Sequence, residues 1–372
     1  MFKHITYKLL FFLPIILLTL FINYFVDPYS VFENSIEKDI AQHIIMGGSV
    51  YPDIYNDRMV QKYLIFNKPN THELIVLGSS RTMTLNKDIF PEFSFFNHSV
   101  VMSTLGDILA IYEMLIETDK EPNIVIIGVD PWFFNRTNQH DRFGSIGSYY
   151  CNFINRLKES NRYVIQSDYH LCIINPIIHI LKTISRLLSL EYFQLSITTL
   201  IESNNRKKEF KVSQNGDHNI ALPIKLPDGS VFQGFELEKR TIFEVNNNVT
   251  TWIYSNIDEL KNFHTIDQKR WDIFTSSILF LKNRGIKVVI VLPPYHPIAY
   301  NFFKDNINYK IITDVENNVK TWSKDNNIPV IWSYDPILCG YDDSDFYDAT
   351  HLRRKSVERN FKAVFDSINY IY

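Results

Sequence analysis

Five short apolar runs, separated by helical stretches and loops, are the feature that most restricts how this 372-residue chain can fold. The third run, Asn123–Val129, is apolar on both faces, as in a strand buried inside a parallel sheet. Strands that alternate with helices imply a parallel sheet with right-handed crossovers. We therefore predict an α/β fold of the three-layer, flavodoxin-like kind. Its five-stranded parallel sheet is expected to use residues 74–77, 93–98, 123–129, 287–292 and 329–332.

Apolar residues at helical spacing predict helices around these strands, over residues 105–116, 268–283, 306–325 and 353–368. The alternation fails between about residues 136 and 264, which contain a polar run and a hairpin turn at Pro227-Asp228-Gly229. We interpret residues 136–264 as a large insertion. It is expected at the C-terminal edge of the sheet, where lids and substrate-binding elements lie.

The N-terminus contains an uncharged apolar run over residues 9–26. A run of this length predicts a transmembrane helix. Basic residues precede the run and Asp27 follows it, so the positive-inside rule places the rest of the chain outside the cytoplasm. No small-residue cleavage site follows, which favours an uncleaved, single-pass anchor in the cytoplasmic membrane over a signal peptide. The expected plan is a cytoplasmic tail (1–8), a transmembrane helix (9–26), a juxtamembrane segment (27–72) and an extracytoplasmic α/β domain (73–372).

Charge and cysteine content exclude several functional classes. The formal net charge of −3 offers no basic face for nucleic acid. No C-x-x-C pair occurs, so neither a zinc site nor a redox motif is indicated. An oxidising compartment would allow the three cysteines one disulfide, with one thiol left over, but the favoured interpretation of all three is as buried small hydrophobes. They are Cys151, Cys172 and Cys339. The acidic run Asp342, Asp343 and Asp345 fits no calcium loop and predicts a solvated loop. We expect no metal and no cofactor.

The first strand ends in the sequence V-L-G-S-S-R-T, residues 76–82. A turn of small residues directly after a buried strand places a side chain at the open edge of the sheet and turns backbone N–H groups toward it. A serine needs both features to attack a carbonyl and to have the developing oxyanion stabilised. Gly-Ser-Ser also occurs in ordinary turns, so Ser80 is a candidate nucleophile only in combination with other residues.

The second motif is Y-D-A-T-H, residues 347–351, after the last strand. An aspartate three residues before a histidine can accept a hydrogen bond from the imidazole Nδ1–H, which fixes the tautomer and stabilises the imidazolium. Taken separately, Asp348 reads as a helix cap or turn residue and His351 as an ordinary histidine. Taken with Ser80, both lie at the same edge of one predicted sheet, and the three residues predict a catalytic triad.

These two motifs resemble the SGNH/GDSL hydrolase superfamily, and most closely its membrane-anchored branch of DltD-like and alginate-acetylation-like proteins. The family's first block, Gly-x-Ser, matches Gly78-Ser79-Ser80, and its last block, Asp-x-x-His, matches Asp348 and His351. The resemblance covers residues 73–128 and the chain from about Lys287 onward. It implies Ser80 as the nucleophile and Ser79 as the intervening residue.

The chain departs from the family at two blocks. The second block supplies a glycine N–H to the oxyanion hole, but residues 97–103 contain no glycine, and a backbone N–H near Met102 is the expected substitute. The third block has an asparagine where this chain has Asp130. An ionised Asp130 cannot donate to an oxyanion. It could donate only if protonated; otherwise it is expected to bind Arg81 or a substrate hydroxyl.

Other residues on the same edge have two interpretations each. Arg81 could clamp an anionic polymer or form a structural ion pair. Tyr295 and His296 could line a substrate groove or belong to a plain loop. Trp132 and Phe133 could stack on a sugar or lie buried under the insertion.

The leading hypothesis is a membrane-anchored serine esterase or O-acyltransferase that acts on a surface glycan or another acylated polymer, with a membrane-bound acyl donor protein as a possible partner. One alternative is a catalytically inactive component that binds or assembles the surface-polymer machinery, keeping the fold without turnover. A weaker alternative is a lipase-like enzyme with residues 171–190 as a membrane-facing lid.

Overall fold

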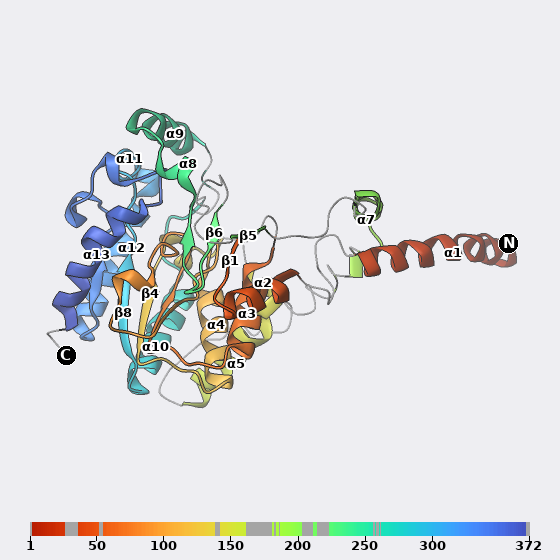
Figure 1. Ribbon diagram of the computed structural model, residues 1–372, viewed down its shortest axis with the longest axis horizontal. Helices are drawn as coiled ribbons and strands as arrows, with labels where there is room; N and C mark the ends of the chain where they lie inside the picture. Colours follow the sequence, from red (N-terminus) through yellow and green to blue (C-terminus); the bar gives the residue numbers. More distant parts are fainter. Residues whose placement is uncertain are drawn as a thin grey trace.

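The computed structural model describes residues 2–26, 36–51, 55–137, 142–160, 181, 184–185, 187–202, 211–213, 223–255, 257, 260 and 262–369. Its centre is a five-stranded, fully parallel sheet in the order β3-β2-β4-β8-β9 (Figure 1). The strands are β2 (Leu74–Leu77), β3 (Phe95–Asn97), β4 (Ile124–Gly128), β8 (Lys287–Leu292) and β9 (Val330–Trp332). Numbered along this sheet alone, the order is 2-1-3-4-5, which is the flavodoxin-like order. The predicted α/β fold and five-stranded parallel sheet are confirmed.

Alternate residues of the strands face two separate apolar cores. Ile75, Val125 and Ile290 belong to the core on one face, while Val76, Ile126 and Val291 belong to the core on the other. The first core includes residues of α4 (Leu105–Glu117), α5 (Gly147–Glu159), α10 (Gln268–Asn283), α11 (Pro297–Asp305) and α12 (Ile311–Asp325). The second core includes residues of α13 (Arg354–Asn369). Burial on both faces explains why these strands are almost entirely apolar.

A second sheet is antiparallel. It pairs a strand from the segment 27–72 with strands from the insertion 136–264. Its order is β5-β1-β6-β7, from β1 (Ser49–Tyr51), β5 (Lys211–Ser213), β6 (Ile224–Lys225) and β7 (Val231–Phe232). The predicted turn at Pro227-Asp228-Gly229 lies between the paired strands β6 and β7. Two helices, α2 (Ile36–Ile45) and α3 (Asp57–Asn67), share an apolar cluster with Val50 of β1 and Phe96 of β3. The elements α2, β1 and α3 of the segment expected beside a membrane therefore pack on the domain.

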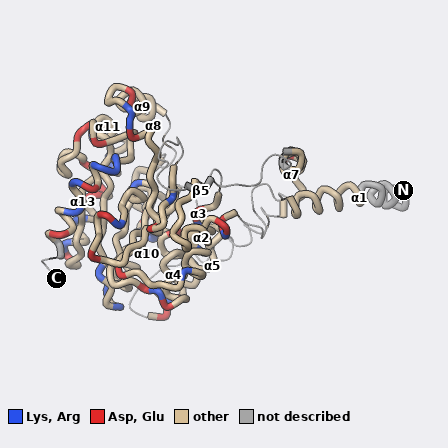
Figure 2. Tube along the Cα trace, viewed as in Figure 1, with Lys and Arg blue, Asp and Glu red and all other residues tan. Residues whose placement is uncertain are grey.

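The remaining helices of the insertion are α7 (Leu190–Glu202), α8 (Phe235–Glu238) and α9 (Ile242–Tyr254). Helix α9 lies near α11 at one end of the molecule (Figure 1). Acidic and basic residues are interleaved along the trace of the α/β body (Figure 2). Most of the apolar stretch 171–190, the basis of the lid hypothesis, lies outside the described residues.

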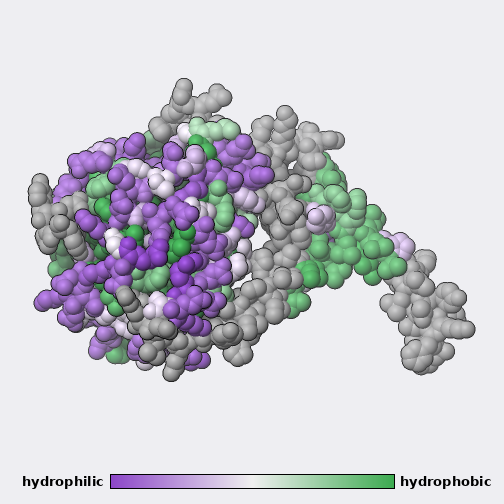
Figure 3. All heavy atoms as spheres, turned by 90° about the horizontal axis from the view of Figure 1, so that it is seen from below, coloured by the Kyte–Doolittle hydropathy of each residue, from purple (hydrophilic) through white to green (hydrophobic). Residues whose placement is uncertain are grey.

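The N-terminal helix α1 (Phe2–Val26) extends away from the body and packs against α7 (Figure 1). The buried Asn23 side chain donates to the carbonyl of Leu187 at 2.8 Å and accepts from Ser196 Oγ at 3.1 Å. Apolar side chains are exposed around this contact and form an apolar patch in Figure 3. Among the described residues, however, no helix combines the length and the apolar character needed to cross a membrane, so the transmembrane span predicted over 9–26 is not supported.

The favoured interpretation of the cysteines as buried small hydrophobes is wrong for Cys151, which takes part in a disulfide bond, the alternative left open by the sequence. Cys339 is a free, half-buried thiol. Cys172 lies outside the described residues. A disulfide is typical of proteins that fold in an oxidising compartment.

The ends of β2 and β4 approach closely at two glycines, Gly78 and Gly128. A Cβ atom added to Gly128 would lie 2.5 Å from Cγ2 of Thr82, which is the side chain at the end of the nucleophile turn. We predict that Gly128→Ala lowers the free energy of unfolding by about 1–3 kcal/mol, because overpacking forces the backbone to shift. Denaturant titration measures this. Gly147→Ala is the matched control, since its Cβ would meet no atom nearer than 3.9 Å; equal losses in both variants would contradict the prediction.

Candidate active site

In the turn after β2, the side chain of Ser79 is buried and that of Ser80 is partly accessible. Ser79 is fully buried; its Oγ accepts from the N–H of Arg81 at 3.2 Å, and its carbonyl accepts from the N–H of Thr82 at 3.0 Å. The Asn97 side chain, at the end of β3, donates to the carbonyls of Thr82 and Leu85 at 2.9 and 2.8 Å. Ser80 lies between these anchored residues and is only partly buried. The turn is therefore fixed on both sides of an accessible hydroxyl.

The segment Asp348–His351 is also held by local hydrogen bonds. Asp348 Oδ1 accepts from the backbone N–H groups of Thr350 and His351, each at 2.8 Å. The backbone of Ala349 accepts from the N–H of His296 at 3.0 Å, which fastens the loop to the end of β8. The ring of Tyr347 stacks on the imidazole with the centroids 5.5 Å apart and the planes parallel to within 1°. The imidazole therefore has little freedom to tilt.

These two segments bring the predicted triad together. His351 Nε2 lies 2.8 Å from Ser80 Oγ, although 271 positions separate the residues. His351 Nδ1 lies 2.8 and 3.0 Å from the two carboxylate oxygens of Asp348. Burial alone raises the pKa of Asp348, but the charge of His351 and the N–H hydrogen bonds outweigh it, so the pKa lies below its ordinary value. An ionised carboxylate next to Nδ1 leaves Nε2 free to accept the serine proton.

A pocket of about 180 Å³ opens at the triad. Ser80 and His351 line it, and apolar side chains form much of the remaining wall. Three of these wall residues, Trp252, Ile257 and Leu260, come from the insertion. The insertion therefore forms part of the pocket at the C-terminal edge of the sheet. The full lining consists of Ser80, Arg81, Met102, Trp132, Trp252, Ile257, Leu260, Tyr295, Thr350 and His351.

Two backbone N–H groups at the pocket are available to stabilise an oxyanion. Within the described part of the chain, the N–H groups of Ser80 and Met102 donate no hydrogen bond to the protein, and both residues line the pocket. The neighbouring N–H groups are engaged: that of Val100 donates to the carbonyl of Gly78, and that of Val101 to Asp57. Met102 has a φ of 49°, a left-handed conformation that costs a non-glycine residue about 1–2 kcal/mol.

Asp130 follows β4 and pairs with Arg81 rather than facing the pocket as an oxyanion donor would. Arg81 Nη1 lies 2.8 Å from Asp130 Oδ1, and the two side chains are 1% and 0% exposed. Burial raises the pKa of Asp130, and the guanidinium acts against this shift. An ionised Asp130 was expected to bind either Arg81 or a substrate hydroxyl, and in the structure it pairs with Arg81.

The other contacts of Arg81 are also internal. Its Nη2 donates to the carbonyl of Pro293 and its Nε to the carbonyl of Thr350 at 3.3 Å. Its guanidinium carbon lies 4.0 Å from the centre of the Tyr295 ring. Arg81 lines the pocket, but each of its three guanidinium nitrogens has an internal acceptor, which favours the structural ion pair over a clamp on an anionic polymer.

Of the other residues that the sequence suggested for the site, some line the pocket and the others are buried in the core. Tyr295 and Trp132 line the pocket, and Trp132 Nε1 donates to the carbonyl of Ser103 at 2.9 Å. Phe133 is fully buried. His296 is fully buried as well, caps α11 through Nδ1, and has a pKa lowered by burial.

The acidic run makes local hydrogen bonds. Asp342 accepts from the N–H of Ser344, and Asp345 pairs with Arg359. The described residues contain no acidic, histidine or cysteine cluster able to hold a metal ion.

Sequence reasoning did not identify Trp252, Ile257 and Leu260, because no pattern in the insertion indicates which side chains turn toward the triad. It also missed Asp57, Arg58 and Asp107, which bond to the loop around Met102. Two acidic residues and an arginine in helices give no local sign that they meet in space.

Comparison of the sequence with known families finds no family model that matches it, and no match among curated proteins. The resemblance to SGNH hydrolases thus rests on the two motifs.

On the hypothesis of a serine esterase, we predict that Asp348→Asn lowers kcat for ester hydrolysis by about 10⁴-fold, because an amide no longer fixes the imidazole tautomer. Steady-state kinetics with a soluble acetyl ester measures the effect. Asp305→Asn, at the exposed end of α11, is the control and should retain full activity. A wild-type kcat in Asp348→Asn would show that His351 does not act through Asp348.

We predict that Asp130→Asn, which restores the family's third-block residue, destabilises the protein instead of improving catalysis. It leaves the buried Arg81 charge without a carboxylate, a change that typically costs about 3–5 kcal/mol. Thermal and denaturant unfolding measure the loss. Asp88→Asn removes an exposed partner of Arg354 and should change stability by no more than about 0.5 kcal/mol. A stable and more active Asp130→Asn would contradict this assignment.

Proposed function

We propose that this protein is a serine esterase or O-acyltransferase of the SGNH type that acts on an acylated surface glycan or related polymer. The observation that carries the proposal is the continuous hydrogen-bonded chain from Ser80 Oγ to His351 Nε2 (2.8 Å) and from His351 Nδ1 to Asp348 (2.8 Å). It lies beside a pocket with two uncommitted N–H groups. Nucleophile, base, orienting carboxylate and oxyanion donors thus occur in one place.

In the proposed reaction, His351 Nε2 takes the proton of Ser80 as Oγ attacks the ester carbonyl. The N–H groups of Ser80 and Met102 stabilise the negative charge on the carbonyl oxygen. Collapse of the tetrahedral intermediate breaks the ester bond, and the protonated His351 returns its proton to the leaving alkoxide. The acyl-serine then reacts with water or with a sugar hydroxyl, which His351 deprotonates in turn. Asp348 remains ionised throughout.

The size of the pocket favours a short acyl group. A cavity of about 180 Å³ is comparable to the engineered cavities of about 150 Å³ that hold benzene. An acetyl or similarly small group fills such a space, whereas a long fatty acyl chain would extend beyond it. This argues against the lipase-like alternative. The apolar wall formed by Trp132, Trp252 and Leu260 suits the methyl end of the acyl group.

Placement outside the cytoplasm is part of the proposal. The charge pattern around residues 9–26 and the disulfide at Cys151 support it. A polymer substrate and a membrane-bound acyl donor are proposed from the family resemblance, as chemistry that a site of this kind serves. The triad geometry supports this enzyme over the inactive assembly component, which a Ser80 hydroxyl far from His351 would have favoured.

We predict that a fluorophosphonate probe labels the wild-type protein at Ser80 and that Ser80→Ala abolishes labelling, because the probe needs an activated serine. Ser94→Ala, which removes an exposed hydroxyl in the loop before β3, is the matched control and should label normally. In the native host, Ser80→Ala should lower acylation of the surface polymer.

Labelling of Ser80→Ala at the wild-type rate, together with unchanged polymer acylation, would reject the enzyme. Faster hydrolysis of long-chain esters than of acetyl esters would reject the short-acyl pocket.

A further inference from the structure

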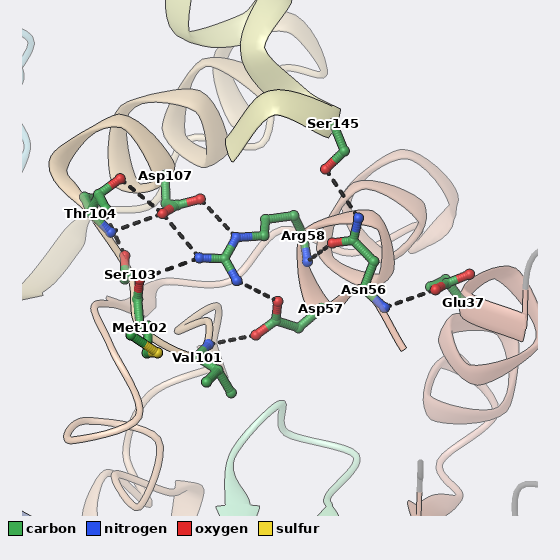
Figure 4. Close-up of polar contacts among 10 residues, drawn as sticks. All are labelled: Glu37, Asn56, Asp57, Arg58, Val101, Met102, Ser103, Thr104, Asp107 and Ser145. Carbon is green, nitrogen blue, oxygen red and sulfur yellow. Dashed lines mark hydrogen bonds and ion pairs between the residues drawn. The ribbon is translucent and has the colours of Figure 1, made fainter. Parts of the chain in front are cut away.

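A buried ion network lies beside the loop that carries Met102 (Figure 4). Its centre is Arg58, in the first turn of α3, whose side chain is 5% exposed. Arg58 contacts Asp107 of α4 with Nε at 2.9 Å and Nη2 at 3.1 Å, and contacts Asp57 with Nη1 at 2.8 Å. Asp107 is fully buried and Asp57 nearly so. Such a network persists only when every charge is paired.

Each member of the network also bonds to the loop 101–104. Asp57 Oδ2 accepts from the N–H of Val101 at 2.5 Å. Asp107 Oδ2 accepts from the N–H and Oγ1 of Thr104 at 2.8 and 3.0 Å. Arg58 Nη2 donates to the carbonyl of Met102 at 3.4 Å. The loop is thus held before, at and after Met102, as Figure 4 shows.

The start of α3 is itself anchored. The N–H of Asn56 donates to Glu37 of α2 at 2.8 Å, and the Asn56 side chain donates to Ser145 at 3.2 Å and accepts from the N–H of Arg58 at 3.1 Å. The position of Arg58 is therefore defined by elements on both sides of it (Figure 4).

Met102 is the residue on which these contacts converge. Its left-handed φ of 49° is unfavourable for a side chain with a Cβ, and such strain persists only where the surrounding structure enforces it. The same residue lines the pocket beside Ser80 and has an N–H without a protein partner within the described chain. A glycine would adopt this conformation without external support.

We infer that Arg58 is a positioning residue of the active site, which acts through Asp57, Asp107 and the loop 101–104 to keep the Met102 N–H in the oxyanion hole. The inference rests on the proposed function, because it assigns the N–H a role in that reaction. The network holds Met102 in a left-handed conformation that a glycine at this position would adopt without support. Arg58 touches no substrate and acts only through the backbone it holds.

The test combines Arg58→Lys with Met102→Gly and measures the second-order rate at which a fluorophosphonate labels Ser80, per folded molecule. A lysine cannot replace the paired contacts of the guanidinium. Arg58→Lys should slow labelling about 10- to 100-fold, since losing one oxyanion donor typically costs about 10²–10³-fold and the loop is loosened rather than removed. Adding Met102→Gly should recover at least about tenfold, because glycine adopts the required φ unaided.

Arg156→Lys is the matched control. Arg156 makes a comparable two-pronged contact with the buried Glu113, also on α4, but bonds to no residue of the loop 101–104. It should lower the melting temperature and leave the labelling rate unchanged. If Arg58 contributes only to stability, Arg58→Lys should likewise lower the melting temperature and leave the labelling rate unchanged. Should Arg58→Lys fail to fold, Asp57→Asn with and without Met102→Gly makes the same comparison.

The outcomes separate the two proposals. If the wild-type protein does not label, the proposed function fails and this inference with it. If the wild type labels and Arg58→Lys labels equally fast, or if Met102→Gly brings no rescue, the positioning role alone is overturned.

Discussion

The contact between Arg81 and Asp130 is the interaction on which the active edge of the sheet depends. Arg81 directly follows the nucleophile, yet its side chain turns inward and reaches the ends of two other strands and the histidine loop. Asp130 continues β4, Pro293 continues β8, and Thr350 precedes His351. A buried guanidinium without these partners would be strongly unfavourable. The need to satisfy one charge therefore draws the nucleophile turn and the base loop to the same point.

This arrangement explains how an aspartate can stand where the related motif has an asparagine. In the family that the motif resembles, the asparagine donates to the oxyanion, whereas Asp130 neutralises the charge of Arg81, the residue after Ser80. The contacts of the Arg81 guanidinium thereby hold the ends of β4 and β8 and the loop before His351 together. In the proposed reaction, backbone N–H groups stabilise the oxyanion, and one of them belongs to Met102, whose left-handed conformation is unfavourable for a residue with a Cβ.

Much of the framework could be predicted from the sequence because it depends on local patterns. The strands at Leu74–Leu77 and Ile124–Gly128 are buried on both faces and so are apolar throughout. Asp348 and His351 are three residues apart, and their pairing needs only one turn of chain. The partner of Asp130 and the role of Arg58 depend on residues brought together from distant elements. The transmembrane span over 9–26 was predicted from an uncharged run, and the described helices do not support it.

The strand β1 has a consequence for the order in which the chain can fold. Ser49 pairs with Ser213, 164 residues later, and Val50 pairs with Lys225 on the other side. At a synthesis rate of about 5–20 residues per second, roughly 8–30 seconds pass before the first of these partners has been made. During that interval both edges of β1 lack their native strands, and an exposed strand edge is a site for mispairing. The antiparallel sheet can therefore form only long after its first strand, β1, has been synthesised.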